Sequence, residues 1–226
     1  MQPPAPFGIF GSMSSEYAVE ERRFLLELDG ERTFEGTCTP SALHALAAGR
    51  LLAEGLLSGR RVAAIDVSDQ GDTIVLDAHL RPAAAHETFS HVRRPRPSPP
   101  PQEALHEMMR ELFRAGDQRH PSGGVHVAAL SDGERLLHIQ TDVGRHNAVD
   151  KVLGGALLID TDTRSLGLVV SARVSGEIAR KATAADVAWI ATRSLPTTLA
   201  IEIAADAGIP IVARAAARDA YVWGAR

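Results

Sequence analysis

The sequence predicts an α/β protein whose second half forms a three-layer α/β/α domain. From residue 125 onward, short apolar stretches typical of buried strands alternate with segments of helical periodicity. The loops between these segments are short, which favours mostly parallel strands covered by helices. A hydrophobic content of 45% over 226 residues is enough for this core and for a small N-terminal lobe.

The first 90 residues are predicted to contain a disordered tail, residues 1–15, followed by an α+β lobe, residues 16–90. The lobe opens with extended pieces that flank a turn at Asp29-Gly30. A helix is expected to begin near Thr39 or Ser41, because both hydroxyls are suited to cap a first turn. The rest of the lobe is predicted to be a hairpin-like pair of strands, at residues 62–67 and 73–78.

A change of composition separates this lobe from the rest of the chain. Residues 91–101 include Arg93-Arg94-Pro95-Arg96-Pro97, and closely spaced prolines neither pair inside a sheet nor continue a helix. This segment is therefore predicted to be an exposed, polyproline-like linker. It leads into the α/β domain, residues 102–226, whose expected elements are helices at 102–115, 145–158, 175–185 and 197–207 and strands at 125–130, 135–141, 166–172, 187–192 and 209–213.

Several functional classes are excluded by composition and motif. The net charge of −4 gives no basic field for nucleic acid, and no apolar run is long enough to span a membrane. The N-terminus lacks the pattern of a signal peptide, so a cytoplasmic location is expected. One cysteine, Cys38, excludes an internal disulfide and a multi-cysteine metal site. Zinc deaminase, nucleophile-elbow and Walker motifs are missing as well, and we expect no bound metal.

Four polar loops at strand ends are the candidate binding residues, because ligands of α/β domains bind where strands end and helices begin. They contain the paired glycines before His126, the ten residues 142–151, the segment 171–177 and the segment 194–198. Each has a simpler interpretation, as a turn or as a capped first helical turn. Together they suggest an anion site, formed by Gly123, Gly124, His126, Asp142, Gly144, Arg145, His146, Asp150 and Arg173.

The same loops carry a resemblance to a known family. The stretch Asp142-Val143-Gly144-Arg145-His146-Asn147-Ala148-Val149-Asp150-Lys151 resembles the signature of the FdhD family, the formate dehydrogenase accessory sulfurtransferases. Shorter matches occur in the same order along residues 20–222. They are Cys38-Thr39-Pro40, Gly123-Gly124-Val125-His126, Ser171-Ala172-Arg173-Val174-Ser175 and Ser194-Leu195-Pro196-Thr197-Thr198-Leu199-Ala200.

The resemblance implies a cytidine-deaminase-like fold without zinc and a role in maturing formate dehydrogenase. Family members take sulfur from a cysteine desulfurase and pass it to the Mo-bis(molybdopterin guanine dinucleotide) cofactor, for which GDP is a partial mimic. A homodimer is a reasonable expectation for this fold. By resemblance, Arg214 and Arg218 after the last strand join Arg145 and Arg173 as phosphate ligands.

Two departures from the family pattern change the expected chemistry. The family carries sulfur on a Cys-x-x-Cys loop, whereas the corresponding residues 91–101 here contain no cysteine. Cys38 is then the only thiol available as a sulfur carrier, and its position before a helix suggests a packed residue. The glycines of the family's last cofactor loop are also replaced, by Ala215, Ala216 and Ala217. The alternatives are a non-catalytic chaperone of the cofactor or of formate dehydrogenase, and a GDP-like nucleotide binder.

Overall fold

The computed structural model describes residues 18–84, 95–217 and 219–224. The predicted tail, the first four residues of the predicted linker and Arg218 lie outside the described residues.

The N-terminal residues form a four-stranded sheet and one helix, as the sequence predicts. The sheet has the order β2-β1-β4-β3, in which β1 is parallel to β4 and the two outer pairs are antiparallel. Helix α1 packs on one face of it through buried residues such as Leu46 and Leu51, against Phe24 and Leu76. The elements are β1 (Arg22–Leu28), β2 (Glu31–Cys38), α1 (Leu43–Ala53), β3 (Arg60–Asp69) and β4 (Thr73–Pro82).

The second sheet has six strands in the order β10-β9-β8-β7-β5-β6. Only β7–β8 and β8–β9 pair in parallel, so the prediction of mostly parallel strands was wrong. There are two reasons: a tight turn joins β5 to β6, which forces an antiparallel pair, and β5 is also antiparallel to the distant strand β7. The strands are β5 (His126–Ser131), β6 (Leu136–Asp142), β7 (Gly167–Val170), β8 (Trp189–Thr192), β9 (Ile211–Ala213) and the unpredicted β10 (Tyr221–Trp223).

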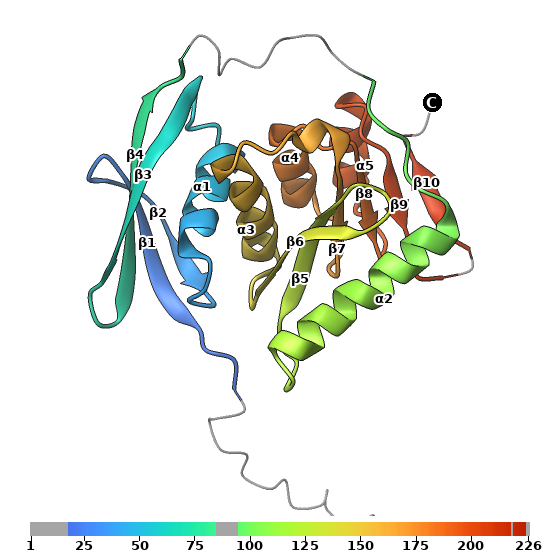
Figure 1. The fold of residues 1–226 in the computed structure, drawn as a ribbon, viewed down its shortest axis with the longest axis horizontal. Coiled ribbons are helices and arrows are strands. Elements are labelled where there is room, and N and C mark those ends of the chain that lie inside the picture. Colours follow the sequence, from blue (N-terminus) through green and yellow to red (C-terminus); the bar gives the residue numbers. More distant parts are fainter. Residues whose placement is uncertain (1–17, 85–94, 218, 225–226) are drawn as a thin grey trace, which may run out of the picture.

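Helices cover both faces of this sheet, which confirms the α/β class and the three layers. One face packs on α2, and alternate residues of the strands, such as Ala128 and Ile190, pack on α3, α4 and α5. Figure 1 shows α2 on one side of the sheet and the other three helices behind it. The helices are α2 (Gln102–Arg119), α3 (Arg145–Leu158), α4 (Gly176–Ala184) and α5 (Thr198–Asp206), with a short 3₁₀ turn, η2 (Thr163–Ser165).

The two sheets are joined through a close crossing of α1 and α3 (Figure 1). A Cβ atom at Gly49 would lie 1.9 Å from the backbone oxygen of Asp150, and one at Gly154 would lie 1.9 Å from the backbone oxygen of Ala45. Only glycine therefore fits at these two positions, because the helix backbones touch there. The crossing places α1 beside the start of α3, where the longest sequence motif lies.

The described part of the predicted linker is docked on the domain, not exposed throughout. The half-buried side chain of Arg96 donates to the backbone oxygen of Ala207 at 2.8 Å, at the end of α5, and it pairs with Asp186. An arginine that binds the last carbonyls of a helix also complements the negative end of the helix dipole. Residues 95–101 are therefore held at the edge of the sheet where α5 ends.

Candidate functional site

The polar loops that the sequence singled out meet at one edge of the six-stranded sheet. His126 at the start of β5 pairs with Asp142 at the end of β6. The ends of β7 and β8 lie next to them, since Val170 is paired with Thr192, and β9 continues the series. The loops that follow β6, β7, β8 and β9 therefore lie side by side with the loop that precedes β5. The starts of α3, α4 and α5 lie at the same edge (Figure 1).

Hydrogen bonds between the loops fix this edge. The Ser171 hydroxyl accepts from the backbone N–H of Val127 at 2.9 Å. The Thr192 hydroxyl donates to the backbone oxygen of Ala172 at 2.7 Å, and Arg214 N–H donates to Ser194 O at 3.1 Å. A binding site built this way is ordered before a ligand arrives, which reduces the entropic cost of binding.

Asp142 lies in the interior and ties three segments together. Its fully buried carboxylate lies 2.6 Å from Nζ of Lys151 and accepts from the N–H of Gly144 at 2.8 Å. It also accepts from the N–H of Thr39 at 3.2 Å and from the side chain of Asn147 at 3.1 Å. Because protein donors occupy the oxygens of Asp142, we infer that this carboxylate positions the start of α3.

Asp150 is a second interior carboxylate, in the second turn of α3. Its Oδ1 lies 2.7 Å from Nζ of Lys181 on α4, and its Oδ2 lies 3.2 Å from Arg50 on α1, without the alignment of a hydrogen bond. Burial raises the pKa of Asp150, although the two cations oppose the effect. We infer that Asp150 holds α1, α3 and α4 together and, like Asp142, fixes the position of the helix starts from the protein interior.

Two half-buried histidines stand between this interior and the surface. His146 contacts the Ser175 hydroxyl at 3.3 Å through Nε2 and the Glu177 carboxylate at 3.4 Å through Nδ1. Burial lowers the pKa of His146, Glu177 opposes that effect, and Arg145 adds to it. Burial and then Arg145 likewise lower the pKa of His126. Both rings are thus disposed to be neutral near pH 7. His146 already has a partner at each ring nitrogen, whereas the ring of His126 has no hydrogen-bond partner among the described residues and is open to an incoming acceptor.

The predicted arginines differ in how far they are engaged. Arg145 and Arg173 are exposed, and among the described residues neither has a carboxylate partner. Arg214 has a left-handed backbone, with φ of 52°, and its guanidinium lies 2.9 Å from Asp219. Arg218 is outside the described residues. Arg145 and Arg173 are therefore both open to a ligand at this edge.

The helix starts contribute differently as well. The hydroxyls of Ser175 and Thr197 accept from backbone N–H groups of α4 and α5, so the capping interpretation of those residues is confirmed. Helix α3 instead begins after Gly144, with no side-chain cap. Gly123 and Gly124 both have positive φ, which suits glycine and brings the backbone close to the edge. The uncapped start of α3, beside Arg145, is a favourable place for a phosphate group.

Arg193 is a residue of the edge that the sequence prediction missed. It follows β8 directly, as Arg214 follows β9, and its guanidinium lies 4.6 Å from the ring centre of Phe113 on α2. The signal was available in the sequence: three successive strands predicted at this edge are each followed within three residues by an arginine. The prediction for this loop covered only segment 194–198 and its hydroxyl groups, and it left out Arg193.

Cys38 ends β2 and is fully buried in the core beneath α1. Burial raises the pKa of its thiol to about 12, with Lys151 opposing the effect. A thiol of this kind is neither ionised near pH 7 nor accessible, and a persulfide carrier needs both properties.

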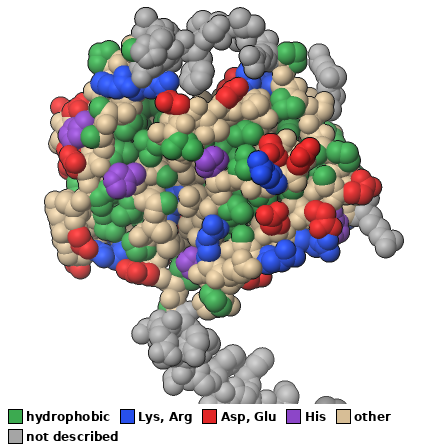
Figure 2. Space-filling model, in the orientation of Figure 1, with side chains coloured by type: hydrophobic (Ala, Val, Ile, Leu, Met, Phe, Trp, Pro, Cys, Tyr) green, Lys and Arg blue, Asp and Glu red, His purple; other side chains and the backbone are tan. Residues whose placement is uncertain are grey.

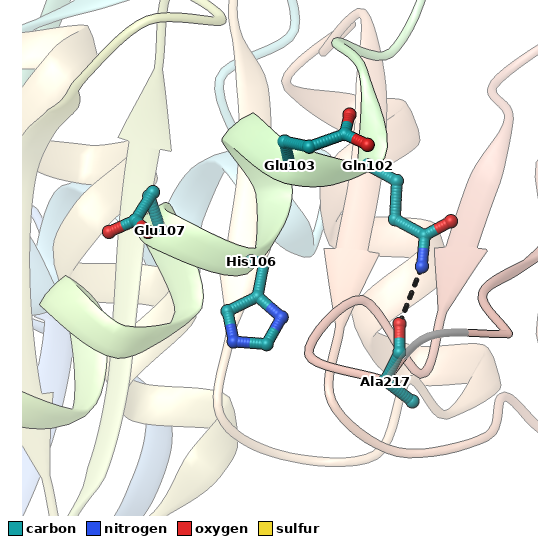
Figure 3. A pocket seen from close by; sticks show the side chains of 5 residues that line it. All are labelled: Gln102, Glu103, His106, Glu107 and Ala217. Atoms are coloured by element: carbon teal, nitrogen blue, oxygen red, sulfur yellow. Dashed lines mark hydrogen bonds between the residues drawn. The ribbon is translucent and has the colours of Figure 1, made fainter.

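Other surface features suit an anion less well. A shallow cavity at the start of α2, shown in Figure 3, is lined by Gln102, Glu103, His106, Glu107 and Ala217, and its two glutamates disfavour negative ligands. The face shown in Figure 2 mixes acidic and basic side chains. Among the described residues no cluster of His, Cys, Asp or Glu could hold a metal ion, and no helix is long and apolar enough to cross a membrane.

Comparisons with known proteins agree on one family. A model of the FdhD/NarQ family matches residues 81–225. The Streptomyces coelicolor protein named sulfur carrier protein FdhD is 32% identical over 232 residues, covering 86% of this chain and 82% of that protein. The Bacillus subtilis protein of the same name is 39% identical over 110 residues, covering 49% of this chain and 42% of its own length.

The solved structures give the same fold. A Desulfotalea psychrophila protein, assigned as a formate dehydrogenase accessory protein, superposes with a TM-score of 0.74 over 91% of this chain and 87% of its own. The sequence identity is 24%. The Bacillus matches cover less than half of those relatives, with 42% for Bacillus subtilis and 44% for Bacillus licheniformis.

Proposed function

The chain belongs to the FdhD/NarQ family, and on that premise we propose that it is an accessory protein for formate dehydrogenase that binds the Mo-bis(molybdopterin guanine dinucleotide) cofactor as cargo. The binding site is the loop edge of the six-stranded sheet. We further propose that the 226 residues do this without carrying sulfur on a thiol of their own.

The observation that carries the proposal is the pair of open arginines at an uncapped helix start. Arg145 and Arg173 have no carboxylate partner among the described residues, and α3 begins beside them without a side-chain cap. A pyrophosphate needs several N–H donors that are not already used. The two guanidinium groups and the first N–H groups of α3 meet this need, so the residues present fit the pyrophosphate of the cofactor's nucleotide part.

The remaining residues of the edge have supporting parts in this proposal. His126 and His146 lie next to Arg145 and can donate to a phosphate or hold the pterin end of the cargo. Gly123 and Gly124 allow the cargo to approach the backbone. Asp142 and Asp150, through their lysine partners, keep α3 and α4 in place beneath it.

The burial of Cys38 supports the second part of the proposal. Sulfur transfer by a persulfide requires a thiolate that can reach both the donor and the acceptor. Cys38 is fully buried and its thiol has a pKa of about 12. A cysteine desulfurase would therefore not load sulfur on it, and the protein would act as a cofactor-binding partner of formate dehydrogenase. We also propose that it acts as a homodimer.

A genetic test separates binding from sulfur transfer. In a strain that lacks this gene, Cys38→Ala should restore formate dehydrogenase activity, whereas the double variant Arg145→Gln/Arg173→Gln should not. Both variants must accumulate to the wild-type level for the comparison to hold. Loss of activity with a stable, folded Cys38→Ala protein would contradict the proposal that no thiol is needed.

A further inference from the structure

We propose that Arg193, whose guanidinium lies over the ring of Phe113, recognises the guanine base of the bound nucleotide and makes the site selective for guanine over adenine. The inference rests on the proposed function, because it concerns the ligand of the same sheet edge. It assigns a specificity role to a residue outside the phosphate-binding loops.

The sheet brings Arg193 to the ligand edge. Ala191 pairs with Val212, and the chain after β9 continues alongside the chain after β8, since Ala215 N–H donates to Thr192 O at 3.0 Å. Arg193 therefore lies between the loop that carries Arg173 and the loop that carries Arg214.

The side chain of Arg193, however, faces α2, on the opposite side of the sheet from α3, α4 and α5. Along β8, Ile190 packs with α3, α4 and α5, whereas Trp189 and Ala191 pack with α2. Arg193 continues the second series, and its contact with Phe113 agrees with this. Arg145 begins α3 and Arg173 lies shortly before α4, and both helices cover the other face of the sheet. A nucleotide with its phosphates at those helices would extend across the edge toward Arg193.

The contact with Phe113 holds the guanidinium over the ring and leaves its N–H donors unused. Arg193 is exposed, and no carboxylate pairs with it in the part of the chain that the structure describes. A fixed guanidinium offers two parallel N–H donors, which match the adjacent O6 and N7 acceptors of guanine. Adenine presents an amino group in place of O6, so one of the two donors would meet another donor.

The aromatic neighbour favours a base over a phosphate at this position. A phosphate would be drawn to the uncapped start of α3 and the open arginines beside it. The ring of Phe113 carries the guanidinium of Arg193, and an arginine placed on an apolar support keeps its N–H donors for the edge of a planar base. A lysine at position 193 would keep the charge but lose both the plane and the paired donors.

Calorimetric titration of the full chain with GDP, ADP and inorganic pyrophosphate tests the inference. The wild-type protein should prefer GDP over ADP. Arg193→Lys should weaken GDP binding by about tenfold, abolish that preference and change pyrophosphate binding by less than about twofold. Phe113→Leu, which keeps an apolar side chain on α2, should reduce the preference as well. The control Arg114→Lys makes the same exchange one residue further along α2 and should change nothing.

Two results would overturn the inference while leaving the proposed function intact. One is equal binding of GDP and ADP by the wild-type protein. The other is an equal loss of GDP and pyrophosphate affinity in Arg193→Lys, which would make Arg193 a phosphate ligand. Binding of neither GDP nor pyrophosphate by the wild-type protein would overturn the proposed function and the inference together.

Discussion

Removing Lys181 should destabilise the protein in a way that depends on pH. In the structure its ammonium lies 2.7 Å from the fully buried carboxylate of Asp150. Lys181→Met keeps the length of the side chain but leaves that charge with Arg50 alone, 3.2 Å away and poorly aligned. Breaking a buried pair by removing one partner costs about 3–5 kcal/mol. Because Arg50 remains, we expect a loss near the lower limit, about 3 kcal/mol of unfolding free energy at pH 7.

The sign of the pH effect follows from the pKa of Asp150. Burial already raises this pKa, and loss of Lys181 removes the largest opposing attraction, so the pKa rises further. The folded state then binds a proton more readily than the unfolded state, and the defect relative to wild type shrinks as pH falls toward about 5. Urea unfolding followed by circular dichroism at both pH values measures this difference.

A double variant provides the control. In Asp150→Asn/Lys181→Met the buried carboxylate and its ammonium partner are both removed, while Arg50 keeps Glu54 and Glu177 as partners, so most of the stability at neutral pH should return. An equal loss at both pH values in Lys181→Met, or a loss below about 1 kcal/mol, would refute this account of how α3 and α4 are held together.

Three further predictions concern the helix crossing, the histidines and the thiol. Gly49→Ala should cost at least about 2 kcal/mol of unfolding free energy in urea titrations, because its Cβ would meet the backbone of Asp150. Gly155→Ala should be tolerated, because the nearest atom to its added Cβ lies 3.8 Å away. Equal losses in the two variants would contradict the close crossing of α1 and α3. Binding of sulfate, which does not titrate here, should tighten as the pH falls from about 7 toward about 5, because burial keeps the pKa values of His126 and His146 below the ordinary value and each ring gains a proton only in this range; the double variant to Gln should flatten the dependence. A thiol reagent should label Cys38 only after unfolding, and rapid labelling of the native protein would contradict its burial.

Local sequence patterns predicted most of the fold. Periodicity located α3 at its observed bounds, Arg145–Leu158, and the turn at Asp29-Gly30 marked the hairpin of β1 and β2. Strand direction could not be read locally, because a pairing such as that of β5 with β7 depends on distant segments. The strand β10 was missed for a different reason: three residues carry too little periodicity to stand out.

The candidate site was only partly predictable. Strand-end positions correctly brought His126, Asp142 and Arg173 to one edge, since the order of elements sets where loops meet. Side-chain burial could not be predicted in the same way. Asp142 and Asp150 lie in the most polar stretch of the chain, yet both are fully buried. Asp142 pairs with Lys151 of the same stretch, which is also buried, and Asp150 pairs with the distant Lys181.

The most direct test of the central claim is a calorimetric titration with GDP of the wild-type protein and two double variants. Arg145→Gln/Arg173→Gln removes the open cations of the sheet edge. Arg32→Gln/Arg135→Gln removes the same charge from exposed residues paired with Glu35 and Asp132, away from that edge. We predict that the first variant loses at least about a hundredfold in affinity and the second less than about twofold. Failure of the wild-type protein to bind GDP at millimolar concentration, or equal losses in both variants, would contradict the assignment of this edge as a nucleotide site.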